Sequence, residues 1–371
     1  MVENRYDLTA LRRIHPKLDD LGDLPYNDHQ LRWEAGGRVG KLSIQGVQPK
    51  LSARLNLKNQ AFELVDQQGR FILKPQNDQF PVLPENEDLT MKLAKLSGLE
   101  VPDHGLIYGV DGVLTYWIRR FDRIGRDEKL HQEDFAQLSG GKRDTKYDSS
   151  MEEVAGIVQR YCAFPLVESA KLFRLVLLNF LCGNEDHHLK NFSLIENSGG
   201  GMRLSPCYDL VNSTIVLKNP VEIALSLRDK QRKLTKEDFL DYYGRQVLTL
   251  QPRLIETILQ ELAASLAQWP DWIERSFLWP KYKTLYKDLM HARAERLGFH
   301  WLTVDPEALE VLEKASLQKG SGGHQSFFKR LETQRCGPTY CLTEQQLEII
   351  QDRQSGSGGW QTAYRILGSE G

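Results

Sequence analysis

The chain has 371 residues, of which 40% are hydrophobic and 26% charged, and its formal net charge is −2. This near-neutral balance argues against a protein built mainly to coat nucleic acid. With no signal peptide or membrane-length apolar run, the chain is expected to be cytoplasmic and without membrane association. Five cysteines, an odd count, predict reduced thiols.

The first 118 residues divide into two parts. Residues 1–40 are polar, with turns expected at Pro25 and Gly36-Gly37, and predict an N-terminal extension. Residues 41–118 alternate strand-like runs with an amphipathic helix over 87–96 and predict a small β-rich lobe. Within that lobe the run 42–52 has one glycine, so it is neither a Walker A loop nor a GxGxxG motif. Read alone it is an ordinary hairpin, although such a turn can lay backbone N–H groups over phosphates.

A lysine ends the next strand-like run, just before Pro75. Lys74 is either the solvated basic end of a strand or the lysine that grips nucleotide phosphates in protein kinases. A phosphate-binding lysine needs a carboxylate to aim it, and Glu85 and Glu87 open the following helix. We favour Glu87 as that partner. The acidic residues also complement the dipole at the helix N-terminus, and both roles can hold.

Residues 119–310 predict a larger helical lobe. Apolar residues recur at three-to-four spacing over the segments 151–164, 166–182, 236–248, 252–268 and 281–297. The segment 166–182 is almost wholly apolar near its end, so it is expected to be a buried helix that holds the following loop rigid.

That loop, residues 183–191, carries the strongest chemical signal. Asp186 and Asn191 lie five residues apart, as do the proton-accepting Asp and the magnesium-binding Asn of the protein-kinase catalytic loop. Asp209 is the next carboxylate in an apolar setting and is where a second magnesium ligand is expected. The alternative is that such a polar loop serves only turns and caps. His187 and His188 suggest a metal site, but adjacent histidines lack the spacing of zinc ligands.

Residues 311–371 differ in character from the rest. A glycine-rich linker pattern at 318–323 precedes helical segments expected at 325–332, 343–353 and after Trp360. We expect a small appended helical module, either for docking or DNA contact or simply for stability.

Six motifs occur in a fixed order along the chain: residues 43–50 (SIQGVQPK), 71–75 (FILKP), 86–87 (NE), 120–123 (RFDR), 186–193 (DHHLKNFS) and 208–210 (YDL). In this order the chain resembles the HipA family of bacterial serine/threonine-kinase toxins, and most closely its short HipT branch. The resemblance covers roughly residues 40 to 300. It implies an α+β, two-lobed, protein-kinase-like fold with a β-rich N-lobe and a helical C-lobe.

The resemblance also implies a role for each matching residue. Asp186 would be the general base, and Asn191 and Asp209 would hold Mg²⁺. Lys74, oriented by Glu87, would bind the phosphates of ATP. The remaining ATP contacts would come from Gln45, Gly46, Val47, Gln48, Pro49 and Lys50 in the nucleotide loop, from Arg119, Arg120 and Phe121 at the hinge, and from His188, Lys190 and Tyr208.

Two positions depart from the family pattern. Ser43 matches the serine whose autophosphorylation displaces the nucleotide loop, but the second serine common in the HipT branch is replaced by Gln45. Ser43 is therefore the expected autophosphorylation site. Arg119 stands where a glutamate is common, so adenine contact is expected through the hinge backbone.

By resemblance, the chain is expected to be the toxin of a type II toxin–antitoxin system. It would use ATP and Mg²⁺ to phosphorylate a cellular protein, for which an aminoacyl-tRNA synthetase is the first candidate. Its expected partners are cognate antitoxins: a HipB-like DNA-binding protein, through which it would meet DNA indirectly, and a small HipS-like protein. The alternatives are an inactive kinase-fold corepressor and a small-molecule kinase. Keeping Lys74, Asp186, Asn191 and Asp209 together favours an active kinase over the inactive corepressor, and Ser43 at the start of the nucleotide loop favours a protein acceptor over a small molecule.

Overall fold

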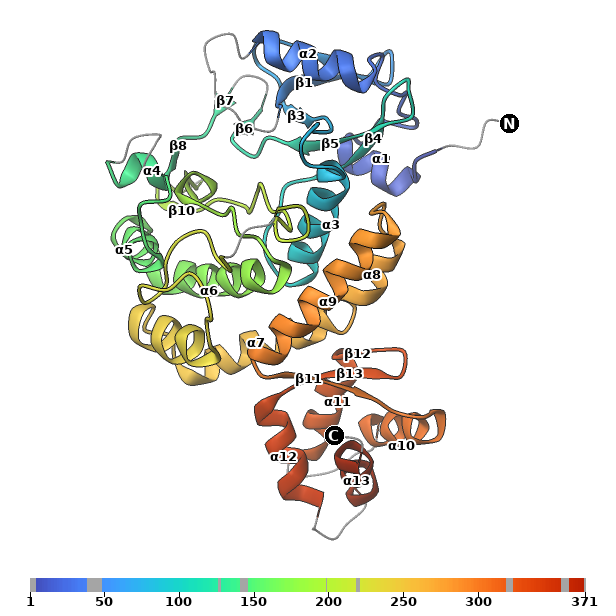
Figure 1. Ribbon diagram of the computed structural model, residues 1–371, viewed down its shortest axis with the longest axis vertical. Coiled ribbons are helices and arrows are strands. Elements are labelled where there is room, and N and C mark those ends of the chain that lie inside the picture. The colour runs from blue at the N-terminus through green and yellow to red at the C-terminus, as the bar shows by residue number, and fades with distance from the viewer. Residues whose placement is uncertain are drawn as a thin grey trace.

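The computed structural model describes residues 5–38, 49–125, 128–140, 146–197, 199–217, 221–317, 323–354 and 360–369. The upper part of the molecule is built on a five-stranded antiparallel sheet of order β2-β1-β3-β5-β4 (Figure 1). Its strands are β1 (Leu51–Asn56), β2 (Ala61–Leu64), β3 (Phe71–Lys74), β4 (His104–Tyr108) and β5 (Leu114–Arg119). Because β3 is the central strand, its last residue, Lys74, lies opposite Tyr116 of β5 inside the protein.

Two helices of the N-terminal segment pack against this sheet. Helices α1 (Leu8–Ile14) and α2 (Asp28–Arg38) share an apolar cluster with strand residues that include Phe62, Phe71 and Trp117. The turn expected at Gly36-Gly37 is wrong, because both glycines lie within α2. Since α1 is only seven residues long, it shows too little periodicity to be recognised from the sequence.

Helix α3 (Leu83–Leu96) crosses from the sheet toward the lower helices (Figure 1). It starts one turn earlier than expected, with Pro84 in its first turn, where a missing N–H costs no helical hydrogen bond. Its first turns are buried although they carry Glu85, Asn86 and Glu87. A helix that buries charged residues needs a partner for each of them, and α3 therefore brings polar side chains into the interior.

Below the sheet in Figure 1 lies a larger helical unit, called the lower lobe here, around the buried helix α6 (Pro165–Cys182). Each helical segment expected for this lobe is present, although 236–248 forms a π-helix. The other helices are α4 (Phe135–Leu138), α5 (Met151–Tyr161), the 3-10 helix η2 (Leu189–Asn191), the π-helix η3 (Asp238–Val247), α7 (Pro252–Leu266), α8 (Trp269–Arg275) and α9 (Pro280–Arg296). The short strands that follow the five-stranded sheet in the chain are β6 (Arg123–Ile124), β7 (Glu128–Lys129), β8 (Gln132–Asp134), β9 (Ser193–Glu196) and β10 (Met202–Leu204).

The C-terminal segment forms a unit with its own apolar cluster, below α7 in Figure 1. The small helical module expected here has its helices at the expected segments, and it also contains a three-stranded sheet of order β11-β13-β12 that was not expected. The Gln334 amide donates to the Gln260 carbonyl of α7 at 2.9 Å and so attaches the unit to the helices above. Its elements are β11 (Phe299–Thr303), α10 (Pro306–Leu317), α11 (His324–Thr333), β12 (Arg335–Cys336), β13 (Thr339–Thr343), α12 (Glu344–Gln354) and α13 (Gln361–Ser369). In the described part of the chain, no helix is both long and apolar enough to cross a membrane.

Candidate active site

A cleft of about 490 Å³ opens between the sheet and the helical part. Residues of β3 and β5 form its upper wall, and the segments around Lys190 and Asp209 form its lower wall. It brings together predicted site residues that are far apart in sequence, namely Lys50, Lys74, Arg119, Arg120, Phe121, Lys190, Tyr208 and Asp209. The predicted residues Ser43, Gln45, Gly46, Val47 and Gln48 lie outside the described residues, and Pro49 directly precedes Lys50.

Lys74 is the buried centre of this arrangement. Its Nζ lies 2.5 Å from Oε1 of Glu87 and also contacts Oδ1 of Asp209. Burial lowers the pKa of Lys74, but the charges of Asp209 and Glu87 outweigh burial and raise it. Burial also raises the pKa of Glu87 to about 7, against the opposing charge of Lys74. Lys74 therefore stays an ammonium group, with a carboxylate on α3 and another on the lower lobe holding it.

Asp209 is held by two ammonium groups. Nζ of Lys50 lies 3.1 Å from Oδ2, while Lys74 contacts Oδ1. Burial acts to raise the pKa of Asp209, but Lys50 and Lys74 outweigh it and lower the pKa well below its usual range. The Asp209 backbone has a φ of +58°, which an L-residue rarely adopts. The fold therefore holds an ionised carboxylate at the cleft, with backbone strain at that residue.

A pair of asparagines connects α3 with the segment after Asp209. The Asn86 amide donates to the Asn212 carbonyl, and the Asn212 N–H donates to the Asn86 side-chain oxygen, both at 2.9 Å. Since Asn86 adjoins Glu87, these two hydrogen bonds fix the distance between the carboxylates on either side of Lys74. The sequence shows Asn86 only as part of a motif and predicts no role for it, because its partner Asn212 is 126 residues away.

The oxygen donors present suit a magnesium ion. Asp209 supplies an ionised carboxylate, and the Asn191 amide donates its N–H to the Asp186 carbonyl at 3.1 Å. Because the nitrogen of Asn191 is used in this way, its amide oxygen is the atom left to bind a cation. Mg²⁺ in phosphoryl-transfer sites takes one or two protein oxygens together with phosphate oxygens and waters. Within the described residues, no three His, Cys, Asp or Glu side chains gather as in a zinc site.

Asp186 lies in the loop of residues 183–191, next to Tyr147. The Tyr147 hydroxyl donates to Oδ1 of Asp186. The His188 ring also packs against Tyr147, with the two ring centroids 5.0 Å apart. Nε2 of His188 lies 2.8 Å from Nζ of Lys146. Among the described residues that line the cleft, Lys190 is present but His188 is not. His188 therefore lies with the segment before α5, outside the cleft wall.

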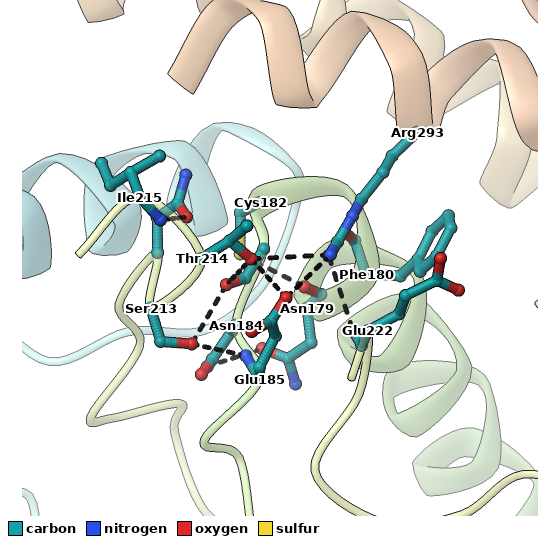
Figure 2. A network of polar contacts seen from close by, with 12 residues as sticks. Asn179, Phe180, Cys182, Asn184, Glu185, Ser213, Thr214, Ile215, Glu222 and Arg293 are labelled. Atoms are coloured by element: carbon teal, nitrogen blue, oxygen red, sulfur yellow. Dashed lines mark hydrogen bonds and ion pairs between the residues drawn. The ribbon is translucent and has the colours of Figure 1, made fainter. Parts of the chain in front are cut away.

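A buried polar network holds the start of the 183–191 loop (Figure 2). The Glu185 N–H donates to the Ser213 hydroxyl at 2.7 Å, and the Glu185 carboxylate pairs with Arg293 of α9 at 3.1 Å. The Thr214 hydroxyl donates to the same carboxylate at 2.6 Å, and Arg293 also donates to the Phe180 carbonyl of α6 at 2.7 Å. Burial raises the pKa of Glu185, opposed by Thr214 and then Arg293. The residue before Asp186 is thus connected to α6, α9 and the 213–214 segment.

Gly183 begins this loop and cannot carry a side chain. Its φ is +75°, and a Cβ atom there would lie 2.4 Å from a Leu289 methyl and 2.7 Å from the Asn212 amide oxygen. Glycine adopts this conformation without steric cost and commonly ends helices for that reason. It lets α6 end abruptly and places the loop directly against α9.

The hinge residues are tied to neighbouring backbone. The Arg119 guanidinium pairs with Asp103 at 3.1 Å and donates to the carbonyls of Arg13 and Ile14 at the end of α1. The backbone N–H groups of Arg119 and Arg120 donate to the carbonyls of Asp103 and Arg70, both at 2.8 Å. Adenine would therefore have to meet other backbone atoms of the hinge. The Phe121 and Tyr208 rings lie 5.6 Å apart and connect hinge and lower wall.

Comparisons with known proteins agree on one family. A family model described as the HipA-like C-terminal domain matches residues 42–269. A Haemophilus influenzae protein described as "Putative kinase" is 30% identical over 263 residues, covering 66% of this chain and 74% of that protein. The serine/threonine-protein kinase toxin HipA of Shewanella oneidensis is 27% identical over 289 residues, covering 70% of this chain and 65% of that protein.

A solved structure is similar as well. One chain of the Shewanella oneidensis complex of HipA, HipB and operator DNA matches with a TM-score of 0.57 and 24% identity. The match covers 74% of this chain and 72% of that chain. This likeness confirms the predicted α+β, kinase-like fold class.

Proposed function

Since this chain belongs to the HipA-like C-terminal domain family, we propose that it is an ATP- and Mg²⁺-dependent serine/threonine protein kinase. The observation that carries the proposal is the chain of ion pairs from Glu87 through Lys74 to Asp209 at the wall of one cleft. Phosphoryl transfer needs little covalent chemistry from the protein, so positioned charges of this kind supply most of the catalysis.

The proposed roles combine the positions of Lys50, Lys74 and Asp209 in the cleft with the roles that the family resemblance implies. Lys74 and Lys50 are the cations that would meet the phosphates of ATP, and the hinge around Phe121 would lie along the adenine. Asn191 and Asp209 would hold Mg²⁺, which when bound neutralises charge on the β- and γ-phosphates. Asp186 would accept the proton of the attacking hydroxyl, whose oxygen forms the new bond to phosphorus as the bond to ADP breaks.

The biological setting is proposed from the relatives. A kinase of this family in Shewanella oneidensis is named a toxin, and the similar solved complex contains HipB and operator DNA. We extend this to a cytoplasmic toxin with a HipB-like antitoxin, which would carry any contact with DNA, and a small HipS-like partner. The acceptor would be a serine or threonine of a cellular protein, with an aminoacyl-tRNA synthetase as the first candidate.

The direct test is transfer of labelled γ-phosphate to protein in the presence of Mg²⁺, together with the Asp209→Asn variant. Removing the Asp209 charge should weaken Mg²⁺-dependent ATP binding by at least about tenfold, or ~1.4 kcal/mol, and should abolish detectable transfer. Binding is measured by calorimetry with and without Mg²⁺, so that loss of the metal contribution is seen directly.

Glu133→Gln is the matched control, because it also removes one negative charge near the cleft. Glu133 lies on β8 between two residues that line the cleft, but its own side chain pairs with His131. It should bind ATP and transfer phosphate like the parent. Unchanged Mg²⁺-dependent affinity in Asp209→Asn would contradict the metal role, and no transfer by the parent to any protein would contradict the proposed function.

Ser43 is the proposed site of self-regulation. After incubation with ATP and Mg²⁺, mass spectrometry should find phosphate on Ser43, and the phosphorylated protein should bind ATP more weakly than Ser43→Ala treated in the same way. The physical reason is charge, since a phosphate adds nearly two negative charges where the loop is expected to meet the phosphates of ATP. Phosphate found only at other residues would remove this idea.

A further inference from the structure

The segment from Lys146 to Ser150 lies across the 183–191 loop. The Leu189 N–H donates to the Lys146 carbonyl at 3.2 Å, and Nζ of Lys146 lies 2.8 Å from Nε2 of His188. The segment then continues into α5, where the Ser150 hydroxyl accepts a hydrogen bond from the Glu153 N–H at 3.3 Å. It is therefore attached at both ends, to the loop and to a helix of the lower lobe.

Tyr147 is the residue of this segment that reaches Asp186. Its ring is held on two sides, edge-to-face with the His188 ring at 5.0 Å and with the Lys146 ammonium 4.8 Å from its centroid. Burial and then Asp186 raise the pKa of the Tyr147 hydroxyl above its usual value. The hydroxyl therefore stays protonated at neutral pH and donates to the carboxylate.

The contacts of Asp186 divide between its backbone and its side chain. The Asn191 amide holds the carbonyl of Asp186, and the Asn184 side chain accepts from its N–H at 3.3 Å. Within the described ranges, the hydrogen bond to the Asp186 carboxylate comes from Tyr147 alone. Without the tyrosine hydroxyl, the carboxylate would keep a fixed backbone but gain freedom to rotate about its side-chain bonds.

We infer that Tyr147 is a positioning residue, whose hydroxyl binds Oδ1 of Asp186 and leaves Oδ2 to take the proton of the acceptor hydroxyl. This inference rests on the proposed function, since it concerns the proposed base. A carboxylate has two oxygens and about four lone-pair sites, so one donor can orient it and still leave lone pairs free to accept a proton. The anchored backbone of Lys146 distinguishes this arrangement from a loose segment that merely covers the site.

The decisive variant is Tyr147→Phe, which removes only the hydroxyl. Because this hydrogen bond is made to a charged group, its loss should lower kcat by about tenfold to a hundredfold. The KM for ATP should stay within about twofold of the parent value, and the melting temperature within about 2 °C, because the hydroxyl touches neither the cleft wall nor the core. Tyr161→Phe, an exposed tyrosine on α5, is the matched control and should behave as the parent.

A double variant separates positioning from other roles. If Tyr147 acts through Asp186, Tyr147→Phe should change the residual rate of Asp186→Asn by less than about threefold. Additive losses would overturn the inference, as would a Tyr147→Phe variant that is more active than the parent or raises only KM. Phosphate found on Tyr147 itself would also overturn it, because the residue would then be an acceptor.

A spectroscopic measurement keeps the inference separate from the proposed function. With ¹³C at the tyrosine Cζ positions, the Tyr147 signal is assigned by its loss in Tyr147→Phe. This signal should shift on Asp186→Ala, which removes the acceptor oxygen of the hydrogen bond, whether or not the protein transfers phosphate. An unshifted signal would show that the hydroxyl does not bind Asp186 and would overturn the inference, while an inactive parent with a shifted signal would count against the kinase proposal alone.

Discussion

Asp186→Asn should lower the rate of phosphoryl transfer by about 10²- to 10⁴-fold, the usual contribution of a general base. The substitution removes the proton acceptor but keeps the size of the side chain and an oxygen that can accept from Tyr147. ATP affinity should change little, because Asp186 is not among the residues that line the cleft. Single-turnover transfer to a protein acceptor and calorimetric ATP binding measure the two effects separately.

The control for this variant is Asp241→Asn, which removes the same charge from an exposed aspartate of η3 that pairs with Arg245. It should keep the activity and ATP affinity of the parent. A phosphoproteomic comparison of cells expressing the parent and Asp186→Asn would then identify the acceptor. Activity close to the parent in Asp186→Asn would show that another group takes the proton.

Local sequence patterns were sufficient to predict much of the fold. Periodic apolar residues gave α5, α6, α7 and α9 to within a few residues, since each is long and buries either one face or, in α6, most of its length. The strand that ends at Lys74 was also expected, and the cleft brings Lys74 and Asp209 into contact as the sequence interpretation required. Both kinds of signal depend on neighbours in the chain, which a single sequence displays directly.

The partners that hold the site could not be predicted in this way. Asn86 binds Asn212, Glu185 pairs with Arg293, and Tyr147 binds Asp186, across 126, 108 and 39 residues respectively. Each of these residues reads locally as a helix cap, a surface charge or a loop aromatic. Periodicity shows which face of a helix is apolar, but it does not show which buried polar group will lie opposite.

Short elements near the two ends of the chain were missed for a related reason, although the helices expected at 325–332, 343–353 and after Trp360 are present. Helix α1 and the strands β11 and β12 are short, and their apolar residues become informative only against the surfaces they cover. Arg119 illustrates the consequence: its guanidinium binds carbonyls at the end of α1. The unexpected helix therefore explains why a cation at the hinge is tolerated.

Arg293→Ala should destabilise the protein by about 3–5 kcal/mol, because it leaves the Glu185 carboxylate buried without its ionic partner. Glu185 and Arg293 are both buried, and in the variant the Phe180 carbonyl also loses the hydrogen bond that Arg293 donates to it. Unfolding in urea measures the free energy, and the melting temperature should fall as well. The exposed pair Arg275 and Asp271 provides the control, since Arg275→Ala should cost about 1 kcal/mol or less.

A double variant tests whether the loss comes from the unpaired charge. Glu185→Gln in the Arg293→Met background removes the stranded carboxylate while a long apolar side chain fills the arginine site. Since replacing both members of a buried ion pair is far less costly than removing one, the double variant should be more stable than Arg293→Met alone. Its activity should still lie below that of the parent, because Glu185 would no longer be tied to α9 beside Asp186. If Glu185→Gln instead destabilises Arg293→Met further, the carboxylate is held chiefly by the Thr214 hydroxyl rather than by the ion pair.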